Sequence, residues 1–148
     1  MSESAAPPGY STVSPYLTVK DVAGAIRFQV EVFGGVEVER IVGEDGSIGH
    51  AEVRIGSSLI MLGASVGDAG ARQAALYVYV ADVDAAYARA LGQGAVSHRV
   101  PTDQFYGDRV GAVIDPGGTL WWIATNREPL SQAEIQARAD RRSPGQQA

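Results

Sequence analysis

The hydrophobic positions of the chain follow two different periods in turn. From Thr12 to Val19 every second residue is apolar or proline, which predicts a half-buried strand. After Asp21, a residue type favoured at helix N-caps, apolar residues recur every three or four positions as far as Phe33. This spacing predicts a helix that ends at Gly34-Gly35, where glycine allows the left-handed backbone of a helix end. Three further strands are predicted at residues 36–42, 49–55 and 57–62.

The second half of the chain repeats this order of elements. Val19 and Val80 lie 61 positions apart, and the same interval separates Leu59 from Leu120. An interval that persists over such a distance indicates two copies of one supersecondary unit. The copy is predicted to contain a strand, a helix capped by Asp82, and three strands (75–80, 83–92, 95–100, 109–114 and 119–124).

The segments outside the repeat have different compositions. Residues 1–9 are small and polar with two prolines, and we expect a flexible start. Residues 64–72 are rich in small residues and are expected to link the two copies. Ser131 and Glu134 have the spacing of a capping box, which predicts a C-terminal helix within residues 131–142.

Composition excludes several classes of function. The net charge of −5 is scattered, and no cluster of Lys and Arg suggests nucleic-acid binding. The chain contains no cysteine, which excludes disulfides, thiolate metal sites and cysteine nucleophiles. It has no apolar run long enough for a membrane span and no signal-peptide pattern, so we expect a cytoplasmic protein with no membrane partner.

Three stretches of sequence resemble a known family. They are 16–21 with 25–28 and 33–35, then 49–62, and finally 104–109 with 115–118 and Trp121. Together they resemble the vicinal oxygen chelate superfamily of glyoxalase I, extradiol dioxygenases and bleomycin-resistance proteins, in its PhnB-like branch. The resemblance implies an α+β fold with one domain at 10–126, in which tandem βαβββ units (about 12–63 and 74–126) form a curved mixed sheet with a concave cavity. It also implies a homodimer.

The resemblance also locates the superfamily's metal ligands. Metal-dependent members supply one ligand from the first strand of each half, seven residues before the capping Asp, and one from the last strand. These positions hold Ser14, Met61, Ala75 and Trp122 here, and none is a normal ligand for a divalent ion. We therefore expect no metal site of the family type and no cofactor.

Strand alternation predicts what lines the concave face instead. Tyrosines lie on the same strand faces as the positions that lack metal ligands. A concave face lined by such rings and hydroxyl groups suits a planar or aromatic organic ligand. Two alternatives stay open: the rings fill the interior, or Arg109 forms a structural ion pair with Glu52 or Asp108. The predicted ligand-binding residues are Tyr16, His50, Glu52, Met61, Tyr77, Tyr79, Arg109 and Trp122.

Two functions are compatible with this site. The first is a non-catalytic protein that sequesters a small molecule, as the bleomycin-resistance proteins do in antibiotic resistance. The second is a lyase, isomerase or dioxygenase of the superfamily with a displaced metal site, or with His50, Glu52 or a tyrosine as general acid or base. The missing metal ligands favour the first.

Overall fold

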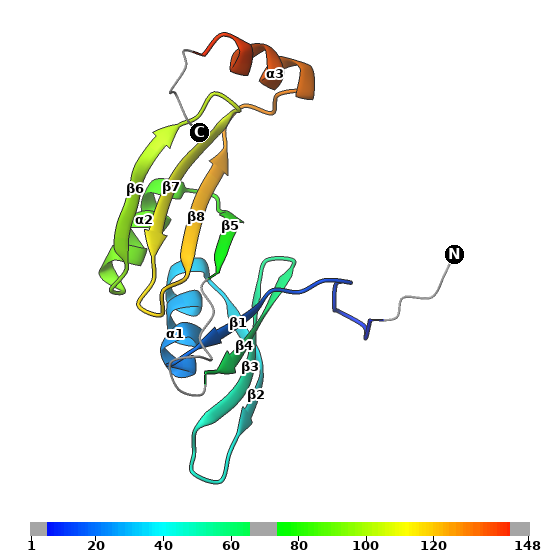
Figure 1. The fold of residues 1–148 in the computed structure, drawn as a ribbon, viewed down its shortest axis with the longest axis vertical. Helices are drawn as coiled ribbons and strands as arrows, with labels where there is room; N and C mark the ends of the chain where they lie inside the picture. The colour runs from blue at the N-terminus through cyan, green and yellow to red at the C-terminus, as the bar shows by residue number, and fades with distance from the viewer. Residues whose placement is uncertain (1–5, 66–73, 143–148) are drawn as a thin grey trace. The chain divides into compact units, whose positions relative to one another are not determined.

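The computed structural model describes residues 6–65 and 74–142 (Figure 1). Residues 1–5 of the expected flexible start and 66–72 of the expected linker lie outside this part of the chain. The chain forms two compact units. The first contains the residues up to 74 with the 115–119 turn, and the second contains 75–114 and the residues from 120 onward.

The first unit is a βαβββ unit with a four-stranded sheet. Its elements are β1 (Tyr16–Val19), α1 (Val22–Phe33), β2 (Val36–Val42), β3 (Ile48–Ile55) and β4 (Ser58–Ala64). The strand order is β1-β4-β3-β2, with β1 parallel to β4 and the other pairs antiparallel. Helix α1 begins where the Asp21 carboxylate accepts a hydrogen bond from the Gly24 N–H at 2.9 Å, and it ends at Gly34 with φ of 67°.

The second unit has the same order of elements and an additional helix. It comprises β5 (Ala75–Tyr79), α2 (Val83–Gly92), β6 (Val96–Asp103), β7 (Asp108–Ile114), β8 (Leu120–Asn126) and α3 (Gln132–Asp140). The strand order is β5-β8-β7-β6, again with only the first pair parallel. The Thr125 hydroxyl donates to the Val80 carbonyl and accepts from the Val83 N–H, both at 2.9 Å, which joins β8 to the start of α2. The predicted α+β fold of tandem βαβββ units is confirmed, with one sheet in each unit.

One helix covers one face of each sheet. Figure 1 shows α2 behind β6, β7 and β8, and α1 packs on β3 and β4. These faces carry buried apolar strand residues, and the opposite face of each sheet, which we call the open face, carries polar and aromatic side chains. The buried strand residues of the helical faces include Leu17, Val19, Ala51, Val53, Ile60, Leu62, Val113, Trp121 and Ile123. Among the described residues, no helix is both long and apolar enough to cross a membrane.

The strand registers refine the repeat. Tyr16 pairs with Met61 as Tyr77 pairs with Trp122, which keeps the interval of 61. Val36 pairs with Arg54 as Val96 pairs with Ile114, so the second and third strands of the units are related by 60. The second unit is one residue shorter between its helix and β6, and one residue longer in its final turn.

Strand β1 is shorter than the alternation predicted. It begins at Tyr16, and Val13 is 83% exposed instead of facing the core. Proline has no N–H, so Pro15 can only accept the hydrogen bond from the Met61 N–H, at 3.0 Å. Residues 12–15 therefore lie outside the strand.

The inner face of α1 carries an unexpected glutamine. The predicted stripe ran through Val30 and Phe33, but both are only half-buried, whereas Gln29 is 1% exposed. Its Nε2 and Oε1 atoms have no hydrogen-bond partner within the described residues. A buried amide without partners destabilises the folded state.

Replacing this amide by a thioether of similar size is expected to stabilise the protein. Gln29→Met should raise the free energy of unfolding by about 1–2 kcal/mol, because the amide no longer has to be desolvated. Chemical denaturation followed by circular dichroism measures the change. Gln93→Met, at the exposed end of α2, is the control and should change stability by less than about 0.5 kcal/mol. A Gln29→Met protein less stable than wild type would contradict the prediction.

Candidate functional site

The open face of the first sheet carries a hydrogen-bonded histidine and carboxylate. His50 Nε2 lies 2.9 Å from Glu52 Oε2, as expected for two residues on one face of a strand. The Tyr10 hydroxyl donates to Glu52 Oε1 at 2.6 Å. On the other side of the imidazole, the Tyr16 hydroxyl lies 3.5 Å from His50 Nδ1. The structure thus brings Tyr16, His50 and Glu52 together and adds Tyr10.

Glu52 is a buried carboxylate, with 4% of its surface exposed. Burial raises the pKa of this carboxyl, but the hydrogen bonds from His50 and Tyr10 outweigh burial and hold the pKa below its usual value. Glu52 is therefore ionised at neutral pH. Glu39 lies directly opposite Glu52 on β2, and one ligand atom from each of Glu39, His50 and Glu52 lies within 4.8 Å of the others.

The open face of the second sheet carries a network centred on Asp108, which is 4% exposed. The hydroxyls of Tyr77 and Tyr79 donate to Asp108 Oδ2 at 2.7 and 2.9 Å. The Asn126 amide donates to Oδ1 at 2.8 Å. The carboxylate therefore fixes the polar ends of both tyrosines, while 45% of Tyr77 and 63% of Tyr79 stay exposed.

The environment of these two phenols suppresses their ionisation. Burial and the hydrogen bond to Asp108 raise the pKa of Tyr77 well above its usual value, and Tyr106 contributes to the same shift. Burial and Asp108 also raise the pKa of Tyr79. A phenolate beside the Asp108 carboxylate would be repelled, so both hydroxyls stay protonated as donors to Asp108.

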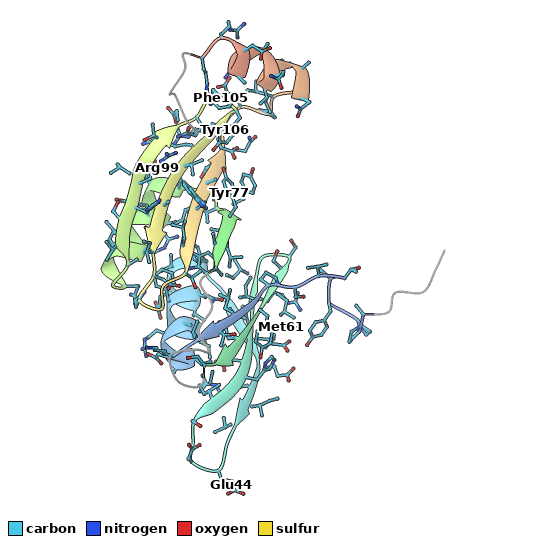
Figure 2. All side chains as sticks on the ribbon, viewed as in Figure 1. Glu44, Met61, Tyr77, Arg99, Phe105 and Tyr106 are labelled. Atoms are coloured by element: carbon cyan, nitrogen blue, oxygen red, sulfur yellow. The ribbon has the colours of Figure 1, made fainter. Side chains whose placement is uncertain are left out.

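Trp122 extends this aromatic surface toward β6. The Arg99 guanidinium carbon lies 5.5 Å from the centre of the Trp122 ring, and the His98 ring meets it edge-on at 5.7 Å. Figure 2 shows Tyr77 on β5 and Arg99 on β6 of the same sheet. We call the surface formed by Tyr77, Tyr79, Trp122 and Arg99 the aromatic face.

Each sheet is crossed by a row of paired residues that begins at an equivalent tyrosine. Both rows start on the first strand of their unit. On the last strand they pass through a position where metal-dependent members of the family have a ligand, held here by Met61 or Trp122. The first row is Tyr16, Met61, Glu52 and Glu39, and the second is Tyr77, Trp122, Ala112 and Arg99. The first row is anionic at its outer end, whereas the second carries a cation beside an indole.

The structure does not bring Arg109 to the aromatic face. Its guanidinium donates to both carboxylate oxygens of Asp84 on α2, at 2.9 and 3.0 Å, and to Asp103 at 3.3 Å. Alternation along β7 places Arg109 on the helical face and Asp108 on the open one. Arg109 thus forms a structural ion pair, but its partners are Asp84 and Asp103 instead of Glu52 or Asp108.

Several residues of these faces were not predicted. Asp108 and Asn126 begin and end paired strands, and alternation alone gives no reason to expect that Asp108 is buried there. Glu39 belongs to a strand whose side chains are nearly all polar or exposed. The signal for Asp108 was local: it directly precedes Arg109, so the two necessarily face opposite sides of the strand.

The two βαβββ units and their polar and aromatic open faces are typical of one class of protein. The chain belongs to the glyoxalase/bleomycin resistance protein/dioxygenase superfamily, whose family model matches residues 11–123. Uncharacterized proteins of Mycobacterium bovis and Mycobacterium tuberculosis are 37% identical to it over 136 aligned positions. The alignments span 84% of this chain and 90% or 80% of the relative.

Solved structures of the same fold include two named proteins. TioX from Micromonospora sp. ML1 has a TM-score of 0.66 and 28% identity, covering 78% of this chain and 98% of its own. The PhnB protein from Bacillus cereus has the same TM-score with 16% identity, covering 78% and 99%, and shows the fold alone. The predicted membership of the glyoxalase/bleomycin resistance/dioxygenase superfamily is confirmed.

Proposed function

We propose that the chain binds a planar or aromatic organic molecule on the aromatic face of the second unit. The observation that carries the proposal is the exposure of Tyr77 and Tyr79 while their hydroxyls are fixed by buried Asp108. Rings that are held in place but uncovered present flat apolar surface at little cost in conformational entropy, which favours stacking of a planar ligand.

The hydrogen bonds of the face define the polar groups that such a ligand would carry. Because each phenol donates its proton to Asp108, its oxygen is left as an acceptor for ligand N–H or O–H groups. Arg99, over the Trp122 ring, supplies donors at the other end of the row. The face therefore fits an aromatic molecule with donors at one edge and an acceptor at the other.

The role that fits this chemistry best is sequestration, as in the bleomycin-resistance branch of the superfamily. Residues unsuited to metal binding at positions 14, 61, 75 and 122 support binding over metal-dependent catalysis of the family type. A resistance function in the cytoplasm would follow if the ligand is a toxic aromatic compound.

Tryptophan fluorescence tests the proposal directly. Trp121 is buried on the helical face, so a ligand on the aromatic face quenches Trp122 selectively. Titration with riboflavin and doxorubicin as planar probes is expected to give saturable quenching and a higher melting temperature. In Trp122→Phe the quenching should disappear and the affinity should fall about tenfold.

The control is Tyr87→Phe, which alters a tyrosine on α2 that bonds to Ser97. Its affinity for the probes is expected to match wild type. The proposal fails if neither probe quenches or stabilises the wild-type protein, or if Tyr87→Phe weakens binding as much as Trp122→Phe.

We also propose a homodimer, on the basis of exposed apolar residues along the outer strands. Val36, Val38 and Ile41 of β2 are 47–61% exposed, and Val96 and Val100 of β6 are 67% and 66% exposed. Exposed apolar residues on edge strands favour packing against a second copy of the chain. Sedimentation at micromolar concentration should give twice the chain mass, and a monomer would contradict this.

A second candidate function is acid–base catalysis by the His50–Glu52 pair. A buried carboxylate at 2.9 Å from an imidazole holds the ring in a fixed orientation, as general acid–base catalysis requires. The test is turnover of the methylglyoxal–glutathione hemithioacetal by wild type and by His50→Ala. Equal rates for the two proteins would exclude His50 from catalysis.

A further inference from the structure

We propose that Glu39, His50 and Glu52 form a binding site for a divalent first-row transition metal ion on the open face of the first sheet. Each of the three residues offers one ligand atom, and these atoms lie within 4.8 Å of one another. The site stands apart from positions 14, 61, 75 and 122, where the resemblance placed the superfamily's ligands.

The distances suit a coordination sphere. Ligand atoms about 2.1 Å from an ion, at octahedral or tetrahedral angles, lie roughly 3.0–3.4 Å from one another. His50 Nε2 and Glu52 Oε2 are already 2.9 Å apart. An ion at this place would exchange the hydrogen bond between them for two coordinate bonds, and Glu39 would supply the third from β2.

Two tyrosines support the ligands from outside. The Tyr10 hydroxyl holds Glu52 Oε1 at 2.6 Å, which leaves Oε2 as the atom that faces His50. Tyr16 lies 3.5 Å from His50 Nδ1, so it can accept the ring N–H when Nε2 is coordinated. Metal-bound histidines and carboxylates usually have such outer hydrogen bonds, which fix ring orientation and tautomer.

Electrostatics supplies an independent reason for a cation here. Glu39 and Glu52 are paired directly across β2 and β3, and like charges in that relation destabilise a sheet. Within the described residues, the basic side chain in contact with Glu52 is His50, at 2.9 Å. In the second unit the corresponding positions hold Arg99 and Ala112, so the charge excess belongs to the first unit.

The donor set indicates the kind of ion. One imidazole and two carboxylates suit Zn²⁺, Mn²⁺ or Fe²⁺. Three protein ligands leave coordination positions open, and oxygen atoms of a small molecule can fill them. Glu39 is exposed, so the site is accessible from solvent.

Cobalt titration of chelator-treated protein without a polyhistidine tag tests the site. Co²⁺ is expected to bind with one ion per chain, to give a visible absorption spectrum, and to be displaced by Zn²⁺. His50→Ala should weaken binding at least about a hundredfold, and Glu39→Gln and Tyr16→Phe about tenfold each.

Matched controls come from the same chain. His98→Ala removes the only other histidine, and Glu37→Gln removes a β2 carboxylate that pairs with Arg40. Both should bind Co²⁺ like wild type, as should Trp122→Phe, so this result is independent of the aromatic face. The site is disproved if wild type binds no Co²⁺ under these conditions. It is equally disproved if His98→Ala weakens binding while His50→Ala or the conservative, exposed Glu39→Gln leaves it unchanged.

Discussion

Gly107→Ala is expected to lower the free energy of unfolding by about 3 kcal/mol or more. Gly107 has φ of +99°, which strains any residue with a side chain, and an added Cβ would lie 2.2 Å from the Glu128 carbonyl oxygen. The Gly107 carbonyl also accepts hydrogen bonds from the N–H groups of Arg127 and Glu128 at 2.9 and 3.0 Å. Relief of the clash therefore has to move two segments apart.

Chemical denaturation measured by tryptophan fluorescence gives the size of this effect. Gly118→Ala is the control, because Gly118 has φ of +93° but nothing within 4 Å of an added Cβ. Gly118→Ala should lower the free energy of unfolding only by the strain of a side chain at positive φ, about 1 kcal/mol. Equal losses for the two variants would mean that the contact with Glu128 is unimportant.

Asp108→Ala has the second large expected effect, a loss of about 3 kcal/mol of stability. The substitution removes a buried carboxylate that is the common acceptor of the Tyr77 and Tyr79 hydroxyls and the Asn126 amide. Asp103→Ala is the control: Asp103 is exposed and bonds to Arg109 at 3.3 Å, so its loss should be below about 1 kcal/mol. A loss in Asp108→Ala no larger than the control's would show that the network does not hold the face together.

The same network predicts a pH dependence. Because the folded-state pKa values of Tyr77 and Tyr79 are raised, their contribution to stability is complete below about pH 10 and is lost as the pH rises above it. Ultraviolet titration of folded protein should show that Tyr77 and Tyr79 resist ionisation, as should Tyr10, whose pKa is raised by its hydrogen bond to Glu52. The Tyr77→Phe/Tyr79→Phe variant should lose less stability between neutral and alkaline pH than wild type does.

The fold was largely predictable because local signals agreed with one another. Asp21 and Asp82 begin helices, and alternation along β4, β5 and β8 assigned the helical faces. The error at residues 12–15 arose because alternation records polarity but not the missing N–H of Pro15. Gln29 was missed for a related reason, since a helical stripe inferred from apolar residues cannot include a buried amide.

The candidate sites were less predictable because their chemistry depends on partners far apart in sequence. The contact between His50 and Glu52 was predictable from the sequence, because residues two apart on one strand lie on the same face. Glu39 needed the register of β2 against β3, and the partners of Asp108 needed the register of β5, β7 and β8. Arg109 was placed on the wrong face because β7 begins with two adjacent charged residues, and their polarity does not show which of them faces the helix.

The change of interval from 61 to 60 limits how parts of the two halves can be exchanged. Ala51 and Ala112 match at 61 in sequence, yet Ala51 faces α1 and Ala112 lies in the row with Trp122 and Arg99. Consider a chimera in which the β7–β8 hairpin replaces the β3–β4 hairpin of the first half. Each β7 residue must replace the residue 60 positions earlier, and each β8 residue must replace the residue 61 positions earlier. A junction at 61 on both sides would shift the transplanted third strand by one residue, placing Arg109 and Val113 on the open face and Val110 on the face that packs on α1.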